Sequence, residues 1–250
     1  MSKNQFKKDN IDLSNTHYLL HFIKNFDKIN TSETEPTTQN INKNIFEEDL
    51  SILIDESVNL IFNELNMGIE ENARKKHFFN YINKNKISSQ EIYNWLLNNQ
   101  SDSNAIYLLG YFNYYGIETN VINMQKAFEL YQKAANLGND LAQHSIANMY
   151  IDGEGVDKNH VLAFELSSKL AEKEYLSGIN LLGCCYEDGI GTDINKPKAF
   201  ELFKKVADLG CSFGMYNLAR CYENGIGTDI DKMKASELYK KATELEDAYG

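Results

Sequence analysis

Residues 142–156 read AQHSIANMYIDGEGV, and this stretch decides the fold because close variants of it return further along the chain. Ile146 and Met149 fall at the spacing of one face of an α-helix. Gly153 and Gly155 follow them, and glycine tolerates the positive backbone angles that end a helix and reverse the chain. The stretch therefore predicts an amphipathic helix that ends in a tight glycine turn.

The sequence repeats itself with a period of 36 residues from about residue 104 onward. Alanines and glycines keep this step: Ala127, Ala163, Ala199 and Ala235, and Gly153, Gly189 and Gly225. Four units result, at about 104–139, 140–175, 176–211 and 212–247. Self-similarity at a fixed period is typical of a solenoid, in which each unit packs on its neighbours.

Each unit divides into two amphipathic helices joined by the glycine turn. The second helix opens on an Asn or Asp that can cap free backbone amides, as at Asn195 and Asp231. Neither helix can bury its apolar face alone, so the units must stack. The sequence therefore predicts an all-α fold, an α/α solenoid superhelix of antiparallel helix pairs over residues 101–250.

The motif at 142–156, together with the run KAFELFKK at 198–205, resembles the Sel-one-like repeat (SLR), a relative of the tetratricopeptide repeat. The resemblance covers residues 104–247. It implies a tetratricopeptide-like superhelix that serves as an adaptor or scaffold in signalling and in protein complexes.

In some fungal proteins such repeats follow a kinase domain through a helical connector, and residues 46–100 look similar to that connector. This chain shows no kinase signature: no Gly-rich strand loop, no His-Arg-Asp and no Asp-Phe-Gly. The alternative to an adaptor is therefore the regulatory repeat tail of a kinase-like protein, with the kinase domain absent from this chain.

The first part of the chain differs in composition from the repeats. Residues 1–45 predict an N-terminal helix, at about 13–29, and a flexible linker over 30–45, which is rich in Asn, Thr, Ser and Glu. The connector over 46–100 predicts three helices. They begin near Glu47, Glu70 and Ser88, the last with a capping box.

Charge and hydropathy exclude several partners. The formal net charge of -11 argues against nucleic acid and against anionic lipid, because both require a basic face. No apolar run is long enough to span a bilayer, and no signal-peptide pattern opens the chain. We therefore expect a cytoplasmic protein without a membrane partner.

No residue is nominated as catalytic, cofactor-binding or metal-binding. The glycine turns follow helices and recur, so they predict turns and not phosphate loops. His17 and His21 have helical metal-ligand spacing, but no acidic residue lies between them, so we expect no zinc site. The four cysteines, all between Cys184 and Cys221, predict reduced thiols.

The candidate site is the face of each first helix opposite its core stripe. In tetratricopeptide-like solenoids this face lines the concave groove, and its contents differ between units here while the core positions repeat. The twelve positions are Tyr107, Tyr111 and Tyr114; His144, Asn148 and Ile151; Asn180, Cys184 and Glu187; and Tyr216, Arg220 and Glu223. The alternative for the three tyrosines is packing against the preceding helix around Trp95.

The expected partner is a protein or peptide that lies along this groove. The last unit has no polar capping helix after it, so Leu238 and Tyr239 are expected near an open end, where a homodimer could form. The sequence leaves open the identity of the partner, the oligomeric state and whether the chain is part of a longer kinase-repeat protein.

Overall fold

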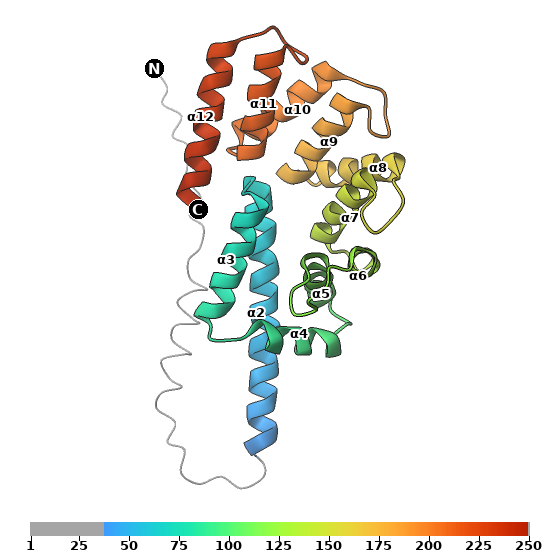
Figure 1. The fold of residues 1–250 in the computed structure, drawn as a ribbon, viewed down its shortest axis with the longest axis vertical. Helices are drawn as coiled ribbons and strands as arrows, with labels where there is room; N and C mark the ends of the chain where they lie inside the picture. The colour runs from blue at the N-terminus through green and yellow to red at the C-terminus, as the bar shows by residue number, and fades with distance from the viewer. Residues whose placement is uncertain (1–37, 250) are drawn as a thin grey trace, which may run out of the picture. The chain divides into compact units, whose positions relative to one another are not determined.

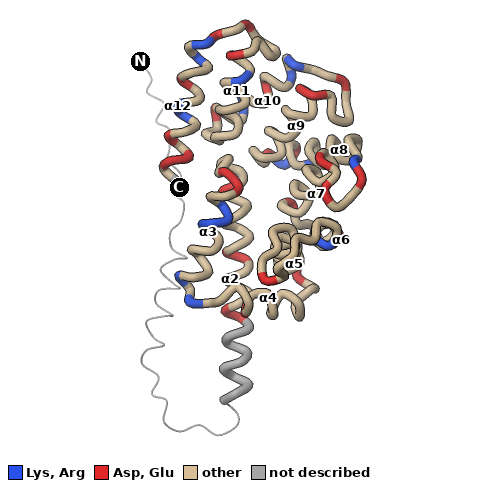
Figure 2. The backbone as a smooth tube through the Cα atoms, viewed as in Figure 1, with Lys and Arg blue, Asp and Glu red and all other residues tan. Residues whose placement is uncertain are grey.

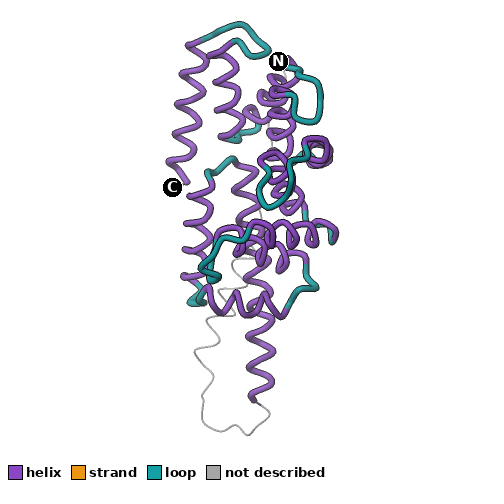
Figure 3. The backbone as a smooth tube through the Cα atoms, turned by 45° about the vertical axis from the view of Figure 1, so that its right-hand side comes forward, coloured by secondary structure: helices purple, strands orange, loops and turns teal. Residues whose placement is uncertain are grey.

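Apolar residues at helical spacing give this chain helices throughout the part that the structure describes. The computed structural model describes the backbone of residues 38–249 and the side chains of residues 48–248. Within these residues every regular element is a helix (Figure 3). The all-α prediction is confirmed.

Three helices precede the repeats: α2 (Thr38–Met67), α3 (Glu71–Lys84) and α4 (Ser89–Asn98). Helix α2 begins at Thr38, so the linker predicted over 30–45 is wrong from that residue onward. Extending an existing helix adds one hydrogen bond for each residue fixed. The helix formed by the apolar residues after Phe46 can therefore extend toward the N-terminus through the polar residues before it. The helix predicted over 13–29 lies outside the described residues.

The capping box predicted at the start of α4 is confirmed. The Oγ of Ser88 accepts a hydrogen bond from the Glu91 amide at 3.2 Å. The Ser88 amide donates in return to Oε2 of Glu91 at 2.8 Å. The bond from the Ser88 amide, and a second one from the Ser88 hydroxyl at 2.8 Å, lower the pKa of the Glu91 carboxyl because they favour its charged form.

Eight helices follow in pairs. The first helices of the pairs are α5 (Ser103–Tyr115), α7 (Asp140–Asp152), α9 (Leu176–Asp188) and α11 (Ser212–Asn224). The second helices are α6 (Met124–Asn136), α8 (His160–Glu172), α10 (Lys196–Asp208) and α12 (Lys232–Tyr249). Each first helix ends on a glycine in the left-handed region: Gly116, Gly153, Gly189 and Gly225.

Side chains at equivalent positions hold successive repeats together. A phenylalanine of α6, α8 and α10 meets a tyrosine of the first helix that follows edge to face, with ring centroids 5.4 Å apart in every case. The pairs are Phe128–Tyr150, Phe164–Tyr186 and Phe200–Tyr222. Such pairs add to the free energy of burial and fix the angle between units.

The second glycine of each turn brings two backbones together. A Cβ on Gly191 would lie 2.1 Å from the carbonyl oxygen of His160, at the start of the preceding repeat's second helix. Gly155 and Gly227 stand in the same relation to Met124 and Lys196. The glycine turns are therefore contact points between repeats, which agrees with their interpretation as turns.

Residues 47–250 form one compact unit. Within it the pairs from α5 to α12 follow one another along a curve, and the hairpin of α2 and α3 lies on the inner side of that curve (Figure 1). Apolar residues of both hairpin helices, such as Ile61 and Phe78, join the same buried cluster as those of α5 to α7. The solenoid prediction is confirmed, and its inner side holds two helices of the chain itself.

Candidate functional site

The inner face of the repeats is formed by the first helices α5, α7, α9 and α11. All twelve predicted positions lie on these helices, three to a helix. They do not share one environment, because the hairpin of α2 and α3 covers part of the face and leaves part open.

In the first repeat the inner face is a cluster of tyrosines. Tyr107 and Tyr111 are only 3% and 4% exposed, and Tyr114 is half-buried. The Tyr107 ring stacks on Tyr131 of α6 with centroids 5.2 Å apart, and Tyr111 meets Tyr115 edge to face at 4.5 Å. The sequence analysis did not place Tyr115 in the site, although it lies one residue after Tyr114 on the same helix.

Helix α3 packs on this cluster. The ring centroid of Phe78 lies 5.7 Å from that of Tyr111, and Nζ of Lys75 lies 4.4 Å from the ring centroid of Tyr115. The aromatic contact to the tyrosines thus comes from Phe78 of α3, whereas Trp95, named in the alternative prediction, lies on α4. Burial raises the pKa of Tyr111 and Tyr115 well above its ordinary value, so both phenols keep their protons.

Helix α2 runs past the amino-terminal ends of the first helices. Asn104, in the first turn of α5, donates a hydrogen bond to Asp55 of α2 at 2.8 Å and accepts one from Asn139, the N-cap of α7, at 2.9 Å. Side-chain oxygens are favourable at these ends because the free backbone amides carry partial positive charge. The contacts join α2 to the first two repeats.

The tip of the hairpin reaches the third and fourth repeats. Oδ1 of Asn66 accepts hydrogen bonds from the amide and the hydroxyl of Ser177, at 3.2 and 3.1 Å, in the first turn of α9. Ser212, the first residue of α11, donates from its hydroxyl to the carbonyl of Gly68 at 2.5 Å. The hairpin therefore contacts the starts of both helices.

Beyond the tip, an ion pair joins the inner faces of the third and fourth repeats. The guanidinium of Arg220 donates to both carboxylate oxygens of Glu187, at 2.6 and 2.5 Å. Glu187 is buried, so this two-pronged pair satisfies a carboxylate that is otherwise costly to bury. Two predicted positions thus bind each other.

Tyr216 is a predicted position that is open to solvent, with 54% of its surface exposed. Its ring meets Tyr239 of α12 edge to face at 5.2 Å, and the hydroxyl of Tyr239 donates to Glu223 at 2.9 Å. Glu223 is itself exposed. These three residues form an accessible aromatic and acidic surface on the fourth repeat, which we call the Tyr216 surface.

Two hollows lie near the predicted positions. The first, of about 310 Å³, lies between α3, α5 and α7, with Arg74, Tyr107, Tyr111, His144 and Asn148 among its walls. We call it the tyrosine cavity.

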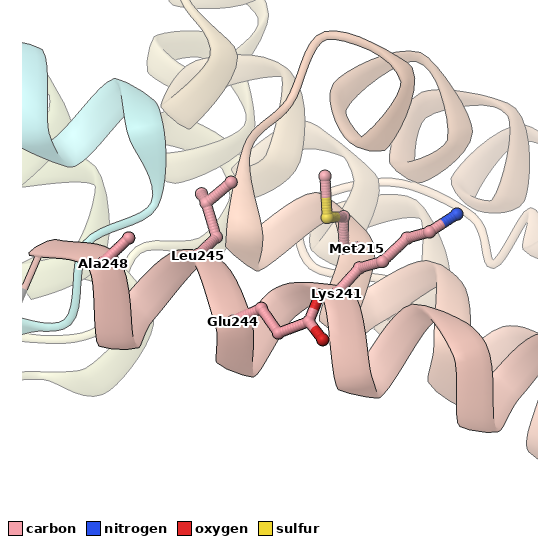
Figure 4. Close-up of a pocket in the computed structure, with 5 residues that line it drawn as sticks. All are labelled: Met215, Lys241, Glu244, Leu245 and Ala248. Atoms are coloured by element: carbon pink, nitrogen blue, oxygen red, sulfur yellow. The ribbon is translucent and has the colours of Figure 1, made fainter.

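The second hollow, of about 590 Å³, lies beside α11 and α12 and is lined by Met215, Lys241, Glu244, Leu245 and Ala248 (Figure 4). It lies close to the carboxyl-terminal end, where a homodimer was expected. That homodimer stays a prediction.

The cysteines are poorly suited to nucleophilic chemistry. All four are free thiols. Burial raises the pKa of Cys184 to about 12 and that of Cys221 to about 11, and it also raises the pKa of Cys185 and Cys211. A thiol, and not the reactive thiolate, is therefore present at neutral pH.

Among the described residues, no three His, Cys, Asp or Glu side chains are grouped so as to hold a metal ion. His17 and His21 lie outside the described residues. None of the described helices is long and apolar enough to cross a membrane. In Figure 2 Lys and Arg positions are interspersed with Asp and Glu along the repeat helices, whereas α3 carries Arg74, Lys75 and Lys76 in succession.

The fold and its inner face define a class of protein, the helical-repeat solenoids. The Sel1 repeat family matches residues 103–139, 140–175, 176–211 and 212–247, more than half of the chain. The chain belongs to the Sel1 repeat family. Proteins of this family are generally scaffolds for protein interaction. The resemblance to kinase-linked repeat tails stays a prediction.

Solved structures of similar fold include a Sel1 repeat protein from Oxalobacter formigenes. It has 23% sequence identity and a TM-score of 0.55, over 70% of this chain and 74% of its own. A second is c5321, a protective antigen present in uropathogenic Escherichia coli strains that displays an SLR fold. It has 22% identity and a TM-score of 0.54, over 79% of this chain. This chain spans 48% of that protein's length. No curated protein matches the sequence significantly.

Proposed function

We propose that this protein is a non-catalytic adaptor that binds a protein or peptide partner through the inner face of its repeats. The observation that supports the proposal is the Tyr216 surface. Tyr216 is 54% exposed on the inner face, although large aromatic side chains gain free energy when they leave water. Tyrosine and arginine are also the residues that most often dominate binding energy at protein interfaces.

The inner face divides into a filled part and an open part. In the first repeat, α3 already occupies the place of a partner, since Phe78 packs on Tyr111. In the fourth repeat, Tyr216 and Glu223 are exposed and Arg220 is half-buried. We therefore place the partner's main contacts on the fourth repeat. Ile151 and Asn180, which are half-buried, would extend them toward the second repeat, while His144 and Asn148 line the tyrosine cavity.

The sequence resemblance implies a signalling complex, and the hydropathy of the sequence favours the cytoplasm as its setting. The open surface combines an aromatic ring and a carboxylate, while Arg220 is held by Glu187. A partner segment with an apolar side chain and a neighbouring basic residue would match this surface. An amphipathic helix or an extended peptide can present such a pair.

The test compares partner capture by two double variants. Tyr216→Ala with Glu223→Ala removes the open surface, and Met233→Ala with Glu237→Ala removes an exposed apolar residue and an exposed carboxylate from α12 as a matched control. Tagged proteins would be used to capture partners from lysate, with quantitative mass spectrometry as the readout. We expect the first variant to lose partners that the wild type and the control retain.

Both variants should keep the helical circular dichroism spectrum and thermal midpoint of the wild type, because all four side chains are exposed. If the Tyr216 and Glu223 variant captures the same partners as the control, the inner face of the fourth repeat is not the binding surface. Size-exclusion chromatography over a range of concentrations checks the homodimer in the same samples.

A further inference from the structure

The tyrosine cavity has the dimensions of a small-molecule site. Its volume is about 310 Å³, and it lies between the connector helix α3 and the first helices of two successive repeats. Ligand pockets commonly begin at ~300 Å³ and lie between packed helices. The cavity is separate from the Tyr216 surface, which is on α11 and α12.

The cavity walls hold buried donors that have no acceptor. The hydroxyl of Tyr111 is fully buried and has no hydrogen-bond partner among residues 48–248. Nε of Arg74 is equally buried and equally without a partner in that range. Buried polar groups in folded proteins are nearly always paired with protein, water or ligand, so these two donors on one cavity can serve an acceptor that enters it.

His144 adds a third donor. Nδ2 of Asn148 lies 3.3 Å from Nδ1 of His144, and because an amide nitrogen can only donate, Nδ1 accepts and the ring proton is assigned to Nε2. Burial, and then the charge of Arg74, lower the pKa of His144 to about 4. At neutral pH the ring is therefore uncharged, and Arg74 supplies the positive charge on this wall.

The other polar groups nearby already have partners or face solvent. The hydroxyl of Tyr114 donates to Glu154 at 2.5 Å. Glu71 and Asp152 line the cavity but are exposed. The buried carboxylate of Glu64 is bound by His77 at 2.8 Å, and the charge of Arg74 acts to lower its pKa. Arg74 is thus the one cation among the cavity-lining residues, and Glu64 offsets part of its charge.

We propose that the tyrosine cavity binds a carboxylate group, held by the guanidinium of Arg74 and the hydroxyl of Tyr111. A carboxylate is an acceptor-only group with two oxygens, which suits two or three converging donors. Its single charge also matches the single cation better than a phosphate would. The rings of Tyr107 and Tyr131 provide a wall on which an apolar body can pack.

The carboxylate could belong to a free organic acid or to the side chain of a partner, and the test separates these sources. Benzoate is titrated into the full chain by isothermal calorimetry, with uncharged benzamide as its control. A blocked peptide with one glutamate is the second ligand, with the glutamine peptide as its control. We expect saturable binding of one carboxylate ligand per chain and at least roughly tenfold weaker binding of its amide.

Two variants test the named donors. Arg74→Gln removes the charge, and Tyr111→Phe removes only the hydroxyl. Each should weaken carboxylate binding by roughly tenfold. Tyr150→Phe, at a half-buried tyrosine outside the cavity, is the matched control and should bind as the wild type does. Tyr111→Phe should leave the thermal midpoint of the free protein equal or higher, because it removes a buried donor without a partner.

Binding of benzoate that depends on Arg74 supports a free acid, and binding of the glutamate peptide alone supports a partner side chain. The proposal is overturned if neither ligand binds, or if Arg74→Gln and Tyr111→Phe bind as tightly as the wild type. The double variant of Tyr216 and Glu223 should keep carboxylate binding, so failure of the adaptor proposal can be told apart from failure of this one.

Discussion

Asn66 of α2 accepts a hydrogen bond from the backbone amide of Ser177, a residue 111 positions later, at 3.2 Å. Helix α9 has no side-chain cap of its own, because Tyr175 stands at the N-cap position. In the preceding repeat Asn139 caps α7 locally, with Oδ1 accepting from the amide of Ala142 at 2.8 Å. The connector thus supplies to α9 the cap that the residue directly before α7 supplies to α7.

Asn66→Ala should therefore destabilise the protein by about 1 kcal/mol, the usual cost of losing a helix cap. Urea unfolding followed by circular dichroism measures the change. Asn98→Ala is the control, since its amide is exposed and bonds only to a carbonyl of its own helix, Asn94. An equal effect of the two variants would show that the bond to Ser177 contributes nothing.

The glycine contacts between repeats predict that two Gly→Ala substitutions differ in how much stability they cost. Gly191 and Gly210 both have positive φ, at 67° and 87°. A Cβ on Gly191 would lie 2.1 Å from the carbonyl oxygen of His160, whereas a Cβ on Gly210 meets nothing within 4 Å. Gly210→Ala should cost about 1–2 kcal/mol of backbone strain, and Gly191→Ala clearly more, on the order of 4 kcal/mol.

Urea unfolding of both glycine variants gives this comparison directly. A similar loss in free energy of unfolding for Gly191→Ala and Gly210→Ala would mean that the repeats can move apart without cost, and the close approach would then not hold the solenoid together.

Two tyrosines at equivalent positions of the repeat should differ in their effect on stability. Tyr107 in the first repeat is 3% exposed, and Tyr216 in the fourth is 54% exposed. Tyr107→Ala should cost about 3–5 kcal/mol, as for other buried aromatic residues, and Tyr216→Ala no more than about 1 kcal/mol. Thermal unfolding measures both, and equal losses would contradict the covering of the first repeat by α3.

Stability should fall in mild acid because of His144. Its pKa is lowered from 6.5 to about 4, chiefly by burial, so the unfolded chain binds a proton more readily than the folded one. The stabilising effect is fully present above pH 6.5, the pKa of the histidine in the unfolded chain. It is lost as the pH falls from 6.5 to about 4, the pKa in the folded protein. It amounts to at most about 3 kcal/mol.

Unfolding of the wild type and of His144→Gln between pH 7 and 4 checks this expectation, with His160→Gln as the control at an exposed histidine. The wild type and the control should lose stability across this range more steeply than His144→Gln. Parallel curves for all three proteins would show that His144 does not titrate differently in the folded state.

The repeat helices could be predicted from sequence because their contacts recur. Ala199 and its equivalents are buried at every step, and the same glycines end every first helix. Each copy therefore confirms the others. The start of α2 at Thr38 had no such support, because the residues before Phe46 are polar and lack periodicity.

The period gives the side of a helix on which a residue lies, but not what packs against that side. Tyr107 and Tyr216 occupy the same place in the repeat, yet Tyr107 is buried against Tyr131 and next to Tyr111, on which α3 packs, while Tyr216 is exposed. The contacts that place the hairpin, such as Asn66 with Ser177, occur once and join distant positions. A single sequence contains no pattern that marks a pair of this kind.

A solenoid resists bending only through the interfaces between adjacent units, since each repeat contacts its neighbours alone. Here Asp55 is bonded to Asn104 in the first repeat, and Asn66 to Ser177 in the third. Gly68 is bonded to Ser212 in the fourth. Helix α2 therefore acts as a strut across the arc, and opening or tightening the curvature requires at least one of these bonds to break. The distance between these contacts along α2 therefore limits the curvature of the solenoid. We expect this solenoid to be stiffer than an array of repeats held only by contacts between neighbours.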